Sequence, residues 1–128
     1  LLHRDGASLA LVGLDDFVRG QPDLTAACEG LDEDTTRIVL AHNPDTADWV
    51  SRDIGVELML SGHTHAGQVR LGNVPLVTQT CNPGYVAGLV AGPGFPIYIS
   101  TGLGVTGIPI RVNARPELPI IVLRRPEG

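Results

Sequence analysis

The chain has 128 residues, of which 43% are hydrophobic, and a formal net charge of −5 with no lysine. This length and composition predict a single globular domain, residues 1–128, with enough apolar residues for a core. The negative charge argues against a broad nucleic-acid surface, and the absence of lysine excludes a P-loop and any Schiff-base mechanism.

The first half of the chain alternates predicted strands and helices. In chain order these are a strand at Ser8–Gly13, a helix at Leu24–Leu31, a strand at Arg37–Ala41, a short amphipathic helix at Asp45–Asp53 and a strand at Val56–Leu60. The last three elements form a β-α-β unit of the right length for a parallel crossover. After Gly72, proline and glycine become dense, and the β-rich runs 74–80, 96–100, 109–112 and 118–124 predict antiparallel sheet with loops.

Three of the four histidines lie where predicted strands end. His63 and His65 stand two residues apart in LSGHTHAGQVR, a spacing that points both imidazoles the same way on an extended backbone. His42 follows the preceding strand of the β-α-β unit. Ligands collect at the carboxyl ends of parallel strands, so we expect His42 and His63 to lie close together and all three histidines to bind metal.

Polar residues beside these histidines are candidates for supporting roles. Asp16, at the end of the first strand, is either a metal ligand or, more commonly for such a residue, a turn cap. Asn43 and Asp45 follow His42, and Asp45 is predicted to cap the next helix and so to hold His42 in place. Gly62 and Gly67, which flank His63 and His65, are predicted to allow close backbone approach.

Arginines and glycines after the histidines suggest contacts with a ligand. Arg70 and Arg111 are candidates to bind a substrate phosphate, although a solvated arginine is the ordinary alternative at each position. Gly102, Gly104 and Gly107 match GxGxxG by letter. A dinucleotide site requires a helix there, whereas a proline follows at once, so the segment is better interpreted as a tight loop at the rim of the site.

Four segments together resemble the calcineurin-like metallophosphoesterases. They are GLDD at 13–16, AHNPD at 41–45, GHTHAGQ at 62–68 and the tail that begins STGLGVTGIPIRVNARPE at 100. The closest resemblance is to the bacterial phosphodiesterase-like branch with GHTHGGQ, and it runs from Gly13 almost to the C-terminus. It implies an α/β fold, the C-terminal half of a four-layer α-β-β-α sandwich with mixed sheets.

The resemblance also implies a hydrolase of phosphoesters with two divalent metal ions, drawn from Mn, Fe, Zn and Co, and a metal-bridged hydroxide. His42 and His63 would serve one metal and His65 its neighbour. The family motifs DxH, GDxxD and GNH[DE], which supply the other ligands and the leaving-group histidine, do not occur here. The chain thus resembles a C-terminal portion that needs an N-terminal half, and alone it is expected to be inactive.

Several properties stay open at this level. The resemblance implies a phosphoester substrate, lipid-linked or nucleotide-like, without choosing between them. No apolar run approaches the ~20 residues of a membrane-spanning helix, and no targeting region is present, so localisation is left between the cytoplasm and the periphery of a bacterial membrane. A mononuclear three-histidine zinc hydrolase or hydratase and a non-catalytic binding module are the two alternatives. Ala66 replaces a usual glycine, which a loop tolerates unless φ is positive.

Overall fold

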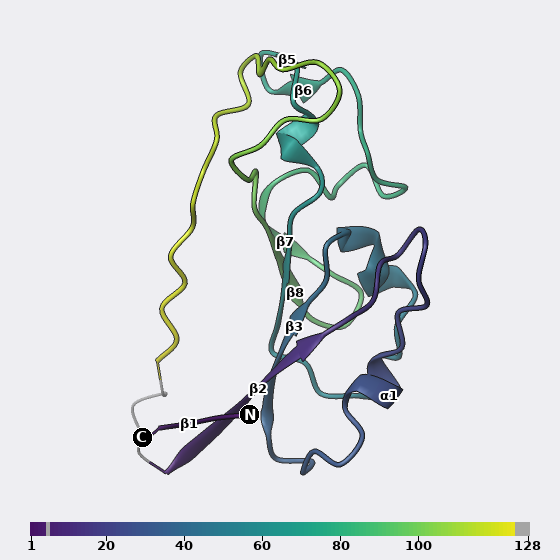
Figure 1. The fold of residues 1–128 in the computed structure, drawn as a ribbon, viewed down its shortest axis with the longest axis vertical. Helices are drawn as coiled ribbons and strands as arrows, with labels where there is room; N and C mark the ends of the chain where they lie inside the picture. Colours follow the sequence, from purple (N-terminus) through teal and green to yellow (C-terminus); the bar gives the residue numbers. More distant parts are fainter. Residues whose placement is uncertain (5, 125–128) are drawn as a thin grey trace.

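The computed structural model describes residues 1–4 and 6–124 of the chain (Figure 1). Six strands form one mixed sheet in the order β1-β2-β3-β4-β8-β7, and β5 and β6 form a separate hairpin. The strands are β1 Leu2–Arg4, β2 Ala7–Gly13, β3 Thr36–Leu40, β4 Leu58–Ser61, β5 Arg70–Leu71, β6 Val74–Pro75, β7 Gly88–Ala91 and β8 Pro96–Ile99. The helical segments are α1 Leu24–Ala27 and the 3-10 turns η1 Pro44–Asp48 and η2 His65–Gly67. The expected mixed α/β sheet is confirmed.

The centre of the sheet is parallel. Strands β2, β3, β4 and β8 run in one direction, while β1 and β7 pair antiparallel at the two edges. Val39, Met59 and Ile97 lie on adjacent strands and are completely buried. These strands therefore bury one face of the sheet fully, while Leu11 and Leu40 remain partly exposed. The predicted parallel crossover is confirmed by the pairing of Ile38 with Leu58, although its connection holds a 3-10 turn in place of the expected α-helix.

Both predicted helices are shorter than expected. Asp23 caps α1, which ends at Ala27 rather than at residue 31, and Gly30 follows with a φ of +79°. The predicted helix 45–53 is only the five-residue 3-10 turn η1. Its successor Trp49 is 75% exposed and packs edge-on against Phe17 at a ring separation of 6.0 Å. Four or five residues are too few for a stable α-helical face.

The predicted strands of the second half are only partly formed. Of the run 74–80 only β6 pairs, and 109–112 contributes a single bridge between Val69 and Val112. The described residues of 118–124 are extended but belong to no strand, and Figure 1 shows this yellow segment beside the sheet, apart from β2 and β3. Strands β1 and β7 were not anticipated. Within the described residues, no helix has the length and apolarity needed to cross a membrane.

Candidate metal site

Two parallel strands deliver the first pair of histidines. His42 and His63 each lie two residues beyond the end of their strand, β3 and β4, and the N–H of Gly62 donates to the His42 carbonyl at 3.1 Å. Nε2 of His42 lies 3.2 Å from Nδ1 of His63, and the rings meet nearly at right angles. The expected proximity of these two imidazoles is thus observed.

This spacing suits a shared metal ion. Two nitrogens bound at ~2.0–2.1 Å to one tetrahedral ion stand roughly 3.3 Å apart, close to the separation observed between His42 and His63. His63 Nε2 also lies 3.1 Å from the carbonyl oxygen of Gln79. A carbonyl only accepts, so Nε2 carries the ring proton and leaves Nδ1, the atom that faces His42, with its lone pair.

His65 is oriented by Gln68. The side-chain nitrogen of Gln68 donates to the carbonyls of Thr106 and Ile108, and its oxygen accepts from the Thr106 N–H at 2.8 Å. These bonds fix the amide so that Oε1 faces His65 Nδ1, 3.1 Å away. His65 therefore donates from Nδ1 and keeps the lone pair of Nε2 for a ligand.

The three histidines do not form one cluster. Among the residues that the structure describes, no group of three histidine, cysteine or acidic side chains is placed to hold a metal ion together. The described part of the chain therefore offers a histidine pair, His42 with His63, and a separate single histidine, His65. Each of these groups would need further ligands to fill a metal shell.

Asp45 does not cap the following turn, contrary to expectation. Asn43 is the N-cap, and its side chain accepts from the N–H of Asp45 at 2.9 Å. The Asp45 carboxylate is 2% exposed and accepts instead from the backbone N–H groups of Cys81 and Asn82, at 2.7 and 3.1 Å. Asp45 therefore fastens the loop that presents the Gln79 carbonyl to His63, rather than acting on His42.

A neighbouring carboxylate acts on the same loop from the surface side. Asp48 accepts a hydrogen bond from the hydroxyl of Tyr85 at 3.2 Å. Burial, reinforced by the charge of Asp48, raises the pKa of Tyr85 to about 12. The phenol thus stays a donor across the neutral range, and its bond to Asp48 persists there.

The histidine loop has an unusual backbone. His63, His65, Ala66 and Gln68 all have positive φ, between +50° and +66°. At Ala66 φ is +55°, a backbone conformation that costs alanine more free energy than glycine. The substitution of the usual glycine by Ala66 is therefore unfavourable here. Gly67 is the position that requires glycine, because a Cβ there would lie 2.3 Å from Pro75 Cβ, whereas a Cβ at Gly62 would meet no atom within 4 Å. The expected steric role of Gly62 is therefore wrong.

The residues at the end of β2 form a turn. The Asp16 carboxylate accepts from the N–H groups of Val18 and Arg19, at 3.0 and 2.7 Å. Backbone N–H groups of Asp16 and Gln21 hold the pKa of the adjacent Asp15 below its usual value. Both carboxylates are thus engaged by local backbone in the structure.

The two arginines proposed for phosphate binding differ in their surroundings. Arg111 donates to carbonyls of the glycine loop and its flank, namely those of Thr101, Gly102, Gly104 and Ala114. Its guanidinium is largely occupied in shaping that loop. Arg70 donates to the Asn73 carbonyl, but its buried Nε has no partner among the described residues.

Two supporting residues were missed by the sequence interpretation. Gln68 belongs to the quoted GHTHAGQ segment, and its place three residues after His65 was a usable signal. Gln79 acts through its backbone carbonyl. Any residue type carries that group, so no sequence signal could have found it.

Comparison with known proteins identifies relatives of the same kind. The chain is 36% identical over 121 residues to the uncharacterized metallophosphoesterase YkuE of Bacillus subtilis, covering 94% of this chain and 42% of the relative. It is 43% identical over 117 residues to the phosphodiesterase YaeI of Escherichia coli, covering 88% and 40%. A bovine transmembrane protein with metallophosphoesterase domain is 37% identical, covering 95% and 29%.

These matches extend over most of the chain but over only about two fifths of the two bacterial relatives. No family model matches the chain, and no solved structure matches it. The resemblance noted in the histidine motifs is nevertheless confirmed by several relatives that carry the same family name. Over most of its length the chain is therefore similar to part of proteins that are named as metallophosphoesterases or phosphodiesterases.

Proposed function

We propose that this chain supplies the histidine side of a dinuclear metal centre in a phosphoester hydrolase. His42 and His63 would bind one divalent ion, and His65 its neighbour. The observation that carries the proposal is the 3.2 Å approach of His42 Nε2 to His63 Nδ1, with the remaining nitrogen of His63 tied to a carbonyl. An oxygen acceptor behind a ligating imidazole is the usual arrangement at protein metal sites.

The residues of this chain would hold and orient the centre. Gln79 and Gln68 fix which nitrogen of His63 and of His65 keeps a lone pair, and the Asp45 carboxylate holds the loop of Gln79. Divalent ions bound there would supply Lewis-acid activation of water and neutralise charge on the phosphoryl oxygens. The remaining ligands, a bridging carboxylate and the acid for the leaving group would come from the rest of the protein.

The geometry favours a dinuclear over a mononuclear centre. A three-histidine zinc site needs three imidazoles around one ion, and no such trio occurs in the described part of the chain. His65 is instead turned by Gln68 and separated from the pair. This supports assigning His65 to a second ion.

For the substrate we propose a phosphodiester, following the phosphodiesterase name of the Escherichia coli relative. Of the two arginines considered for phosphate contact, Arg70 is the better candidate because, among the described residues, its guanidinium donates to the Asn73 carbonyl alone, whereas Arg111 donates to four carbonyls. Whether the ester is lipid-linked or nucleotide-like is not decided by either residue.

The test is metal analysis of the full-length protein with single His42→Ala, His63→Ala and His65→Ala variants. We expect two divalent ions per wild-type chain, loss of metal in each variant and a roughly 100-fold or larger fall in kcat/KM for bis(p-nitrophenyl) phosphate. His3→Ala is the matched control, because His3 lies on the edge strand β1, where its ring bonds Ser8 of β2, and this variant should retain both ions.

Other outcomes would replace the proposal. One tightly held zinc ion, lost equally in all three variants, would indicate the mononuclear hydrolase. Unchanged metal content and unchanged biological function in His63→Ala and His65→Ala would indicate a non-catalytic module.

A further inference from the structure

Charge is divided unevenly along this chain. Twelve of its fourteen acidic residues lie in residues 1–57, and the segment 58–116 contains none, although it carries Arg70, Arg111 and Arg115. The segment 58–116, which holds His63 and His65 but not His42, is thus positively charged in a chain whose net charge is −5. An uneven distribution of this kind orients a protein in the field of a charged surface.

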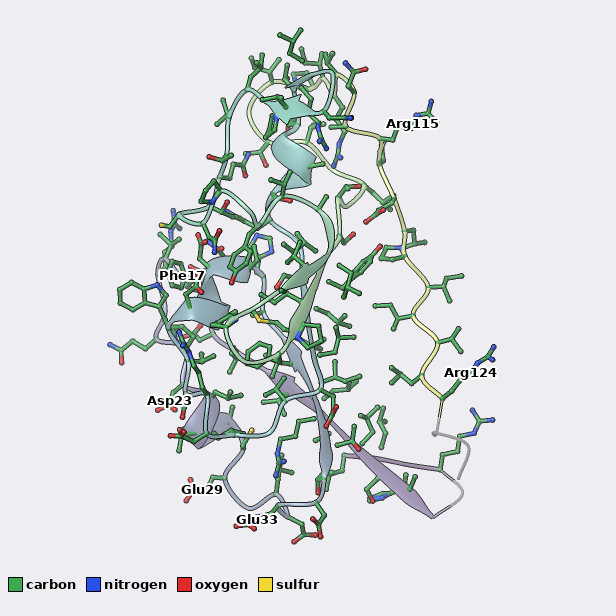
Figure 2. The ribbon with its side chains drawn as sticks, turned by 180° about the vertical axis from the view of Figure 1, so that it is seen from behind. Phe17, Asp23, Glu29, Glu33, Arg115 and Arg124 are labelled. Atoms are coloured by element: carbon green, nitrogen blue, oxygen red, sulfur yellow. The ribbon has the colours of Figure 1, made fainter. Side chains whose placement is uncertain are left out.

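Several acidic side chains lie far from Arg115, although Glu117 is close to it in the chain. Figure 2 shows Asp23, Glu29 and Glu33 near one end and Arg115 near the other, beside the hairpin of β5 and β6. All four side chains are exposed. A surface that attracts the arginine end would therefore keep the acidic end directed away.

Large apolar side chains are exposed at the arginine end. We call them the apolar tip: Leu71, Val74, Leu76 and Val77 of the hairpin, and Leu103, Val105, Ile108 and Ile110 of the glycine loop. Leu71 and Val74 are 77% and 64% exposed and directly opposite one another across the hairpin, so they share one face. A group of exposed aliphatic side chains from two adjoining segments is typical of an interaction surface.

The two halves of the apolar tip are joined to each other. Gln68, which precedes β5, donates to the carbonyls of Thr106 and Ile108 in the glycine loop. The N–H of Arg70 donates to the Val112 carbonyl at 2.9 Å. In Figure 1 both segments lie together at the end of the molecule where β5 and β6 are labelled. The tip is thus presented as a unit next to His65.

We infer that the apolar tip docks this protein on an anionic lipid surface. Aliphatic side chains enter the interfacial region of a bilayer, and adjacent arginines are attracted to anionic headgroups. A nucleic acid would also attract the arginines, but the tip has no aromatic side chain on which bases could stack, since Tyr85 and Phe95 are buried. The inference does not depend on the proposed hydrolysis, because docking requires neither metal nor turnover.

Sedimentation of the full-length protein with vesicles tests the inference. One set of vesicles is phosphatidylcholine alone, and the other also contains phosphatidylglycerol. We expect binding to the anionic set, weakened by salt, and a roughly tenfold or greater loss in the double variant Leu71→Ser and Val74→Ser. Arg115→Gln should weaken binding about fivefold.

Matched controls separate docking from general effects. Val18→Ser removes an apolar side chain that is 73% exposed but lies outside the apolar tip, and Arg124→Gln removes an exposed charge at the far end of the tail that carries Arg115 (Figure 2). Both controls should bind anionic vesicles like the wild type, and all variants should keep the wild-type Tm. Because each variant is compared with the wild type, vesicle binding through any other part of the protein contributes equally to both and does not affect the difference.

Three results would overturn the inference. They are a wild type that binds no vesicle, equal binding to neutral and anionic vesicles, and unchanged binding in the double hairpin variant. The first result would mean that the apolar tip is covered by protein, either by the rest of this chain or by a second copy. Tighter binding to single-stranded nucleic acid than to vesicles would mean that the arginine end binds nucleic acid and not lipid.

Discussion

The parallel strands and the loops that follow them are stabilised by different interactions. In β2, β3, β4 and β8, backbone pairs with backbone, and completely buried side chains such as Met59 and Ile97 fill the core. In residues 62–87 and 101–117, backbone pairing is sparse, and side chains such as Gln68 and Arg111 add hydrogen bonds to backbone groups. The comparison teaches that one part depends on apolar volume and the other on a few polar side chains.

The largest change in the free energy of unfolding is expected for a substitution in the sheet. Met59→Ala removes a fully buried side chain between β3 and β8 and should lower the free energy of unfolding by about 3 kcal/mol, because the sheet cannot collapse into the cavity. Urea denaturation of the full-length protein measures this change. Leu89→Ala on β7, where the side chain is 70% exposed, is the control and should change stability by less than about 0.5 kcal/mol.

A smaller change in the free energy of unfolding is expected for a substitution in the loops. Arg111→Lys keeps the charge but loses the planar fork that reaches several carbonyls, so the free energy of unfolding should fall by about 2 kcal/mol. Hydrogen exchange should also quicken at residues 101–108. Arg124→Lys serves as the comparison and should leave both measurements as they are. A loss as small as that of the control would mean that the glycine loop does not depend on Arg111.

The smallest effect on stability is expected at Asp45. Asparagine can accept from only one of the N–H groups of Cys81 and Asn82, so Asp45→Asn should cost about 1 kcal/mol. The sharper readout is the ring of His63, whose Nε2 proton, detected by nitrogen NMR of the metal-free protein, should become mixed between the two nitrogens. Asp48→Asn still accepts from Tyr85 and should preserve the wild-type signal. An unaltered His63 ring in Asp45→Asn would show that the Gln79 carbonyl is held by other means.

The same division separates what could be predicted from what could not. The runs that became β2, β3 and β4 were predicted because buried parallel strands are continuous apolar stretches. The approach of His42 to His63 followed from that topology. The roles of Asp45 and Gln79 could not be predicted, because their partners lie 16 to 37 residues away in loops without periodicity, and a carbonyl leaves no trace in the sequence.

The predicted length of the second helix was wrong for a related reason. Periodicity over 45–53 indicated an amphipathic helix, but the carboxylate of Asp45 is drawn to a distant loop, and Asn43 starts only a 3-10 turn. Tertiary contacts outweighed local preference there, as they commonly do for short segments.

The strand order also determines how the molecule assembles in time. Strands β2, β3 and β4 pair with partners near them in the chain, whereas β8 reaches β4 only after the chain has passed through the hairpin and β7. Longer closures are slower, so the His42–His63 pair should form before β8 docks and before the Gln79 carbonyl is in place. A newly made chain would then present two imidazoles to passing metal ions while the loop that selects their tautomers is still unfolded, which makes metal availability a variable of the folding reaction itself.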